Sequence, residues 1–131
     1  MRSSAEIWRS INELEDDKLK LESIRHLLSE IGESLLNYSK DLTEISNLLF
    51  EGYNEDEQRI DGKVSEYSEE YYFYANEILS LAESIAIEIS QLTNEISSER
   101  VEYSKAVARE RAAAEEKLSE KRITEIGYSI R

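Results

Sequence analysis

The stretch Phe50-Glu51-Gly52-Tyr53-Asn54 constrains the fold of this chain most, because it is the clearest interruption in an otherwise nearly continuous helical pattern. Gly52 can adopt the left-handed backbone conformation that ends a helix at low steric cost. Asn54 can accept hydrogen bonds from the free amides that begin the next helix. The turn motif Phe50, Gly52 and Asn54 therefore predicts a long antiparallel helical hairpin with its turn at residues 51–54.

Composition favours the same all-α fold. The 131 residues include no proline and only 4 glycines, whereas turn-rich β folds need these residues to form the turns between strands. A hydrophobic content of 40% is sufficient for one apolar seam but low for a thick globular core. We expect a single domain in which two helices pack in the manner of a coiled coil.

The first helix is expected to begin at Ser4, because Ser3 and Glu6 form a capping box. Two apolar rows at seven-residue spacing predict its buried seam. The first row is Ile7, Leu14, Leu21, Leu28, Leu35, Leu42 and Leu49, and the second is Ile24, Ile31, Tyr38 and Ile45. Towards the N-terminus the second row shifts to Ile11 and fails at Lys18. Leu27, Leu36 and Leu48 lie off both rows and widen the apolar stripe, so that a third helix or a partner could cover it.

The second helix carries apolar residues at the same alternating spacing. The predicted seam residues are Ile60, Val64, Tyr67, Tyr71, Tyr74, Ile78, Leu81 and Ile85. From Ile85 the pattern drifts by one residue to Ile89, Leu92 and Ile96, which is typical of a nearly straight helix. Gly62 is the one weak point in this helix.

Packing about Gly52 predicts that the numbers of residues in contact add up to about 104. Tyr67 then lies near Tyr38, and Ile96 lies near Trp8. The paired length ends near Arg100, so residues 1–100 form the hairpin. Residues 101–131 are expected to continue the second helix as an overhang or to form a flexible C-terminal tail.

Charge is unevenly distributed. The formal net charge is −13, which disfavours binding to nucleic acid and to anionic membranes. Residues 1–99 contain 8 basic and 23 acidic groups, whereas residues 100–131 contain 8 and 6. The C-terminal part can therefore dock on acidic helices, of its own chain or of a partner.

No residue pattern indicates a catalytic or metal site. Cysteine is absent, and the single His26 has Glu22 and Glu30 four residues away without the spacing of a bundle metal site. A calcium loop around Gly62 fails because Arg59 and Ser68 stand at ligand positions. No glycine-rich nucleotide loop is present. We expect no cofactor and no enzyme activity.

Exposed aromatic and aliphatic residues are the better candidates for function, as a protein-binding surface. Tyr72 and Phe73 are adjacent and point away from the predicted seam, towards either a partner or a third helix. The partner-binding candidates are Trp8, Leu27, Leu36, Leu48, Tyr72, Phe73, Tyr103, Val107 and Leu118.

At Phe50-Glu51-Gly52 the chain resembles the WXG superfamily of type VII secretion, whose small helical hairpins turn at a Trp-x-Gly motif. The acidic hairpin with a Tyr-rich second arm is most similar to the accessory proteins associated with LXG toxins. Here Phe50 replaces the Trp, and the only Tyr-x-x-x-Glu match, Tyr53 to Glu57, lies at the hinge instead of near the C-terminus.

This resemblance implies a targeting factor or chaperone that binds the helical N-terminal domain of an LXG toxin for export, alone or together with a second small helical protein. The alternative is a structural coiled-coil protein that self-associates, for instance as a homodimer joined through residues 101–131. The sequence shows no membrane span and no conventional signal peptide, so we expect a cytoplasmic protein that either stays there or is co-secreted with its partner.

Overall fold

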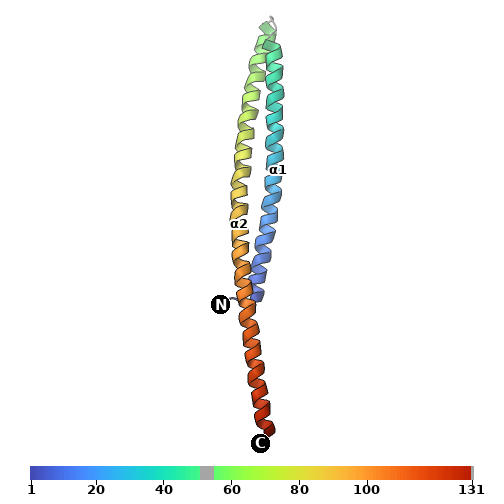
Figure 1. Ribbon diagram of the computed structural model, residues 1–131. Coiled ribbons are helices and arrows are strands. Elements are labelled where there is room, and N and C mark those ends of the chain that lie inside the picture. The colour runs from blue at the N-terminus through green and yellow to red at the C-terminus, as the bar shows by residue number, and fades with distance from the viewer. Residues whose placement is uncertain (51–54, 131) are drawn as a thin grey trace. The chain divides into compact units, whose positions relative to one another are not determined.

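The computed structural model describes residues 1–50 and 55–130 of the chain. In these ranges the chain forms two helices, α1 (Ser4–Phe50) and α2 (Glu55–Ile130), and no strand (Figure 1). The protein is an all-α helical hairpin, in which α2 is the longer helix, with 76 residues against 47. Phe50 of the predicted turn motif is the last residue of α1, while Gly52 and Asn54 lie outside the described residues.

The start of α1 confirms the predicted cap. The amide of Glu6 donates to the hydroxyl oxygen of Ser3 at 3.2 Å, and the amide of Ile7 donates to the Ser3 carbonyl at 3.1 Å. The Ser3 side chain thereby satisfies one of the amides that a helix leaves without intrahelical partners in its first turn, and the Ser3 carbonyl accepts the first i→i−4 bond. The helix begins at Ser4 for this reason.

The chain divides into two compact units, each of which contains a segment of both helices. Unit 1 consists of Met1–Lys18 and Gln91–Arg131, and unit 2 of Leu19–Ser90. In unit 2 the helices run antiparallel, with Ser39 of α1 against Ser68 of α2 and Ser46 against Asp61. The numbers of both pairs add up to 107, which lies within one helical turn of the predicted 104.

Unit 1 has a small apolar core. Ile7, Ile11, Ile96 and Ala106 are buried together, and Leu14 and Tyr103 pack against them. Trp8 was expected beside Ile96. Its indole contacts the ring of Tyr103, which packs against the core that contains Ile96; the ring centroids are 5.3 Å apart and the rings are tilted by 45°.

Polar contacts extend the pairing in unit 1 past Arg100, where the sequence predicts that it ends. The guanidinium of Arg2 donates two hydrogen bonds to the Glu99 carboxylate, at 2.7 and 2.8 Å. The amide and hydroxyl of Ser4 donate to the Glu110 carboxylate, at 2.9 and 2.5 Å. Residues 108–124 are all exposed, so the side chains of α2 after Glu110 contribute little to the core of unit 1.

Candidate partner-binding face

The seam of unit 2 is made of small residues. Among the described residues of this unit, the buried ones are Gly32, Ser39, Ser68, Ala75 and Ala82. They repeat every seven positions along each helix, as do the half-buried Ser46 on α1 and Asp61 on α2. The first predicted row of α1 is confirmed as the other half of the seam, since all its members in unit 2, from Leu21 to Leu49, are half-buried.

Small side chains bring the two backbones close together. Ser39 donates its hydroxyl to the carbonyl oxygen of Ser68 at 2.9 Å, and Ser68 donates to the carbonyl oxygen of Ser39 at the same distance. The Thr43 and Ser68 hydroxyl oxygens are 2.7 Å apart. A hydroxyl reaches the main chain of a neighbouring helix only where the interaxial distance is short, which small residues at the contact allow.

The second predicted row of α1 is wrong. Ile24, Ile31, Tyr38 and Ile45 are 45 to 59% exposed, and the seam of unit 2 instead follows Gly32, Ser39 and Ser46. The physical reason is size, because a pair of helices packs closest where the facing side chains are smallest. Ile11, to which the second row was predicted to shift, lies on the same seven-residue row as Gly32 and is itself buried.

The same correction applies to α2. Ile60, Tyr67, Tyr74 and Leu81 were predicted in the seam but are 47 to 54% exposed, while the residues that follow them, Asp61, Ser68, Ala75 and Ala82, are buried or half-buried. Val64, Ile78 and Ile85 are half-buried as predicted, whereas Tyr71 is 37% exposed. Ile89, Leu92 and Ile96 are buried or half-buried as predicted.

The two misassigned rows lie on the same face of unit 2. Apart from Ile24, which precedes the exposed Arg25, each residue of either row directly precedes a residue of the seam, as Tyr38 precedes Ser39 and Tyr67 precedes Ser68. Two antiparallel helices are related by a twofold axis normal to the plane of the pair, so equivalent positions emerge on the same side. We call these eight residues the outer face: Ile24, Ile31, Tyr38, Ile45, Ile60, Tyr67, Tyr74 and Leu81.

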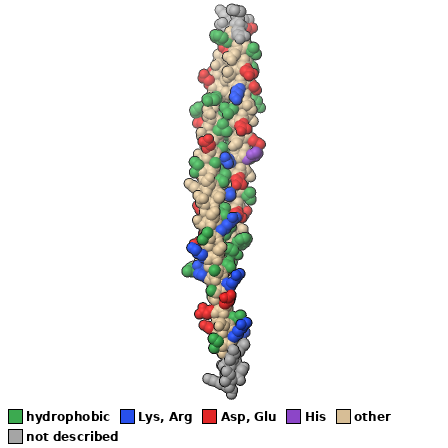
Figure 2. All heavy atoms as spheres, in the orientation of Figure 1, with side chains coloured by type: hydrophobic (Ala, Val, Ile, Leu, Met, Phe, Trp, Pro, Cys, Tyr) green, Lys and Arg blue, Asp and Glu red, His purple; other side chains and the backbone are tan. Residues whose placement is uncertain are grey.

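Two of the predicted partner-binding residues belong beside this face. Leu27 is 57% and Leu48 70% exposed. Each is a helical neighbour of an outer-face residue, since Leu27 lies three positions after Ile24 and Leu48 three after Ile45. They widen the apolar surface on its α1 side. Hydrophobic side chains lie at the surface among acidic ones in Figure 2, which shows one face of the molecule.

Other candidates are placed elsewhere. Leu36 is half-buried and Tyr72 is 55% exposed, and both occupy the opposite side of the seam from the outer face. Phe73 is 58% exposed and lies in the same row as Ile87, on the side of α2 away from the seam. The adjacent aromatic residues Tyr72 and Phe73 are therefore exposed as expected, but they do not form one surface with the outer face.

The remaining candidates belong to unit 1. Trp8 is 52% exposed although its ring contacts the half-buried Tyr103, and Val107 is half-buried beside the core residue Ala106. Leu118 is 50% exposed, in the part of α2 where every described side chain is exposed. These four do not make a surface comparable with the outer face.

No protein-family model, curated protein or solved structure matches this chain. The geometry of the chain itself therefore carries the functional argument. The relevant observation is that eight large apolar side chains of one face are about half exposed, while the residues buried beside them are glycine, serine and alanine. In soluble proteins, contiguous exposed apolar surface is a common feature of interaction sites.

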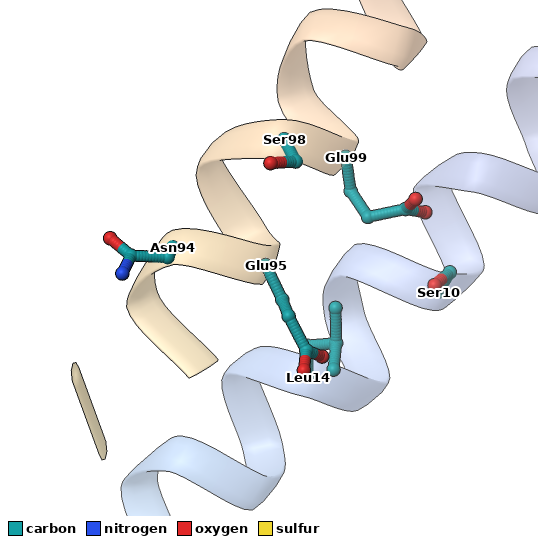
Figure 3. Close-up of a pocket in the computed structure, with 6 residues that line it drawn as sticks. All are labelled: Ser10, Leu14, Asn94, Glu95, Ser98 and Glu99. Atoms are coloured by element: carbon teal, nitrogen blue, oxygen red, sulfur yellow. The ribbon is translucent and has the colours of Figure 1, made fainter. Parts of the chain in front are cut away.

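Polar features of unit 1 are structural in character. A groove of about 370 Å³ is lined by Ser10, Leu14, Asn94, Glu95, Ser98 and Glu99 (Figure 3). In Figure 3 the Glu99 carboxylate points towards Ser10 on α1, while Asn94 points away. Hydrogen bonds from Arg2, and secondly from Ser10, lower the pKa of Glu99. This carboxylate is thus held as an ion and joins the two helices.

His26 shows no sign of a ligand cluster. Its Nε2 lies 3.0 Å from a carboxylate oxygen of Glu30 on the same helix, and the His26 side chain is 73% exposed. Across the described residues, no group of three or more potential metal ligands comes together. No helix in the described part of the chain has a stretch that is both long and apolar enough to cross a membrane.

The outer face had a signal in the sequence that periodicity of apolar residues alone does not reveal. Gly32, Ser39 and Ser46 are small and seven residues apart, as are Ser68, Ala75 and Ala82. Two such rows of small residues, one on each arm of a hairpin, indicate a close helix pair. Once they are assigned to the seam, the large residues beside them must lie outside.

Proposed function

We propose that this protein is a non-enzymatic helix-binding protein, in which the outer face of unit 2 covers an amphipathic helical segment of a larger client. The observation that supports this function most directly is that small residues are buried in the seam while the large apolar residues beside them are exposed. A chain that only had to hold its own two helices together would gain more by burying Ile31, Tyr38, Tyr67 and Tyr74 than by exposing them. A helix of a partner that lies between the two rows would bury both at once.

The resemblance to accessory proteins of LXG toxins suggests the client. Such a client is the helical N-terminal domain of the toxin, and the function is that of a chaperone or targeting factor for type VII export. An uncovered client helix would expose its own apolar stripe. Binding to the outer face protects both stripes from non-specific association.

The alternative is a structural coiled-coil protein that self-associates through the same face. Light scattering on the isolated chain separates the two functions. Self-association predicts an oligomer whose fraction increases with concentration, whereas a client-binding protein requires no such oligomer to function.

The test is calorimetric titration of the full chain with the N-terminal domain of an LXG toxin encoded beside it. We expect Ile31→Asp, on the outer face, to weaken binding by at least tenfold, on the order of 1.4 kcal/mol. Ile87→Asp is the matched control, because Ile87 is an isoleucine of unit 2 that is 62% exposed and lies off the outer face. It should change the affinity less than about twofold. Equal effects of the two substitutions, or no binding by the unsubstituted chain, would contradict the proposal.

A further inference from the structure

Charge around the outer face defines the chemistry of the helix that binds there. Residues 19–90, which make up unit 2, contain 5 basic and 16 acidic groups. A second protein that approaches this unit therefore meets a negative potential before it makes any contact.

Acidic side chains also border the outer face itself. On α1, Asp41 lies three positions after Tyr38 and four before Ile45, which makes it a surface neighbour of both. On α2, Glu77 stands in the same relation to Tyr74 and Leu81. The exposed acidic residues along the border are Asp41, Asp56, Glu70, Glu77 and Glu88, and the exposed basic ones are Lys20 and Lys63.

We propose, on the basis of the proposed function, that the segment bound by the outer face is an amphipathic helix whose apolar stripe is flanked by lysine and arginine. Its apolar residues lie between the two rows of the outer face, and its basic residues meet the acidic border on both sides. Charges at the edge of an interface select partners and steer association more than they add affinity.

The same border disfavours a second copy of this chain on the outer face. Two outer faces in contact bring two acidic borders together, and like charges placed opposite each other at an interface cost free energy. The basic residues of α2 from Arg111 to Arg122 do not remove this difficulty. Apart from Leu118 and Ile123, the apolar side chains of residues 111–124 are alanines, so residues 111–124 have too little apolar surface to fill the face.

The test uses two synthetic amphipathic helices with identical leucine and isoleucine stripes, one flanked by lysine and the other by glutamate. Binding to the full chain is measured by fluorescence anisotropy at about 50 and 500 mM salt. We expect the lysine-flanked peptide to bind at least tenfold more tightly at low salt, and this preference to fall several-fold at high salt, because salt screens exposed charges. A lysine-flanked peptide with a scrambled stripe serves as the control for non-specific attraction and should not bind.

Two double variants of equal charge locate the effect. Glu70→Lys/Glu77→Lys changes the border of the outer face, whereas Glu66→Lys/Glu69→Lys changes α2 on its other sides. We expect the first to reduce the preference for the lysine-flanked peptide at least threefold, and the second to leave it within about twofold. Circular dichroism confirms that both variants remain helical.

The failures are distinguishable. If both peptides bind equally well, or if both double variants reduce the preference equally, the charge inference is wrong while helix binding stands. If neither peptide binds, the proposed function fails as well. If the chain forms a homo-oligomer and Ile31→Asp makes it dissociate into monomers, a second copy occupies the outer face and the inference of a basic partner is overturned.

Discussion

Gly32 of α1 lies so close to Leu79 of α2 that a β-carbon on Gly32 would fall 2.7 Å from both Cγ and Cδ2 of Leu79. The carbonyl oxygen of Ala75 would lie 3.6 Å from the same position. Glycine in the middle of a helix costs about 0.5–1 kcal/mol relative to alanine. At this position the close approach of α2 explains why the cost is accepted.

A comparison of two glycines tests this close approach. Beyond its chain neighbours and the backbone of its own helix, Gly62 has no heavy atom within 4 Å of an added β-carbon. We therefore expect Gly62→Ala to stabilise the protein by about 0.5–1 kcal/mol. Gly32→Ala should not give this stabilisation, because Leu79 must move to make room for the β-carbon. In a Leu79→Ala background, Gly32→Ala should become stabilising. Urea denaturation of the unsubstituted chain, Gly32→Ala, Leu79→Ala and the double variant measures the coupling between the two positions.

Ile11 is the largest fully buried side chain among the described residues and belongs to the core of unit 1. Ile11→Ala removes three buried carbons and leaves a cavity, which should cost about 2–4 kcal/mol. Ile87→Ala is the control, with an expected change within about 0.5 kcal/mol, because Ile87 is exposed. Urea denaturation measures the free energy of unfolding. Amide hydrogen exchange shows where stability is lost: faster exchange confined to the residues of unit 1 indicates that unit 1 alone opens, whereas faster exchange in both units indicates global unfolding. A cost below 1 kcal/mol for Ile11→Ala would contradict the position of this core.

Trp8 is the only tryptophan of the chain, so its emission reports on unit 1. Its ring contacts Tyr103 at 5.3 Å between centroids, an aromatic pair of the kind that contributes about 0.5–1.5 kcal/mol beyond area burial. Tyr103→Ala should shift the emission of Trp8 to longer wavelength, because the indole loses its cover from α2. Leu118→Ala, which changes an exposed residue away from Trp8, should leave the emission unchanged. An unaltered spectrum in Tyr103→Ala would show that the two rings do not pair.

Acid should loosen the N-terminal end of unit 1. The hydrogen bonds from Arg2 lower the pKa of Glu99, and those from the hydroxyl and amide of Ser4 lower the pKa of Glu110. A carboxylate whose pKa is lower in the folded protein stabilises the fold fully above its unfolded pKa, and this contribution is lost as the pH falls through the folded pKa. We expect faster amide exchange at residues 4–8, corrected for intrinsic rates, as the pH falls below about 4.3.

The control for this pH dependence is Glu99→Gln/Glu110→Gln, which should already exchange faster at pH 7 and respond less to acid. Glu116→Gln, in the exposed part of α2, should behave as the unsubstituted chain. The protein must be dilute, because the pI of about 4.5 lies within the pH range of this titration and proteins associate most readily near zero net charge. If the double variant keeps the full acid response, other carboxylates are responsible.

The two helices and their start were predictable because strong local signals determine them. The capping box at Ser3 and Glu6 and the interruption after Phe50 each act within a few residues. The row from Leu21 to Leu49 was also found, since it is apolar at every step and partly buried in unit 2. Its continuation as the seam of unit 1 through Ile7 and Leu14 followed from the same spacing.

The outer face was not predictable from apolar periodicity, because that method assumes that the largest apolar residues are buried. Tyr38 and Ser39 are adjacent, and both continue a seven-residue row, so the pattern alone does not determine which row is inside. The packing of one backbone against the other decides it in favour of Ser39. Placing Tyr38 and Tyr67 in the seam was the main error, and it hid the surface on which the proposed function depends.

Disulfide formation between introduced cysteines tests the orientation of the two helices most directly, since the natural chain has no cysteine. The Ser39 and Ser68 hydroxyl oxygens lie 3.4 Å apart, so the two side chains meet within reach of a disulfide. We predict that Ser39→Cys/Ser68→Cys forms an intramolecular disulfide rapidly in air, and that Tyr38→Cys/Tyr67→Cys oxidises far more slowly. Faster bridging of the Tyr38 and Tyr67 positions would place the outer face in the seam and contradict this account.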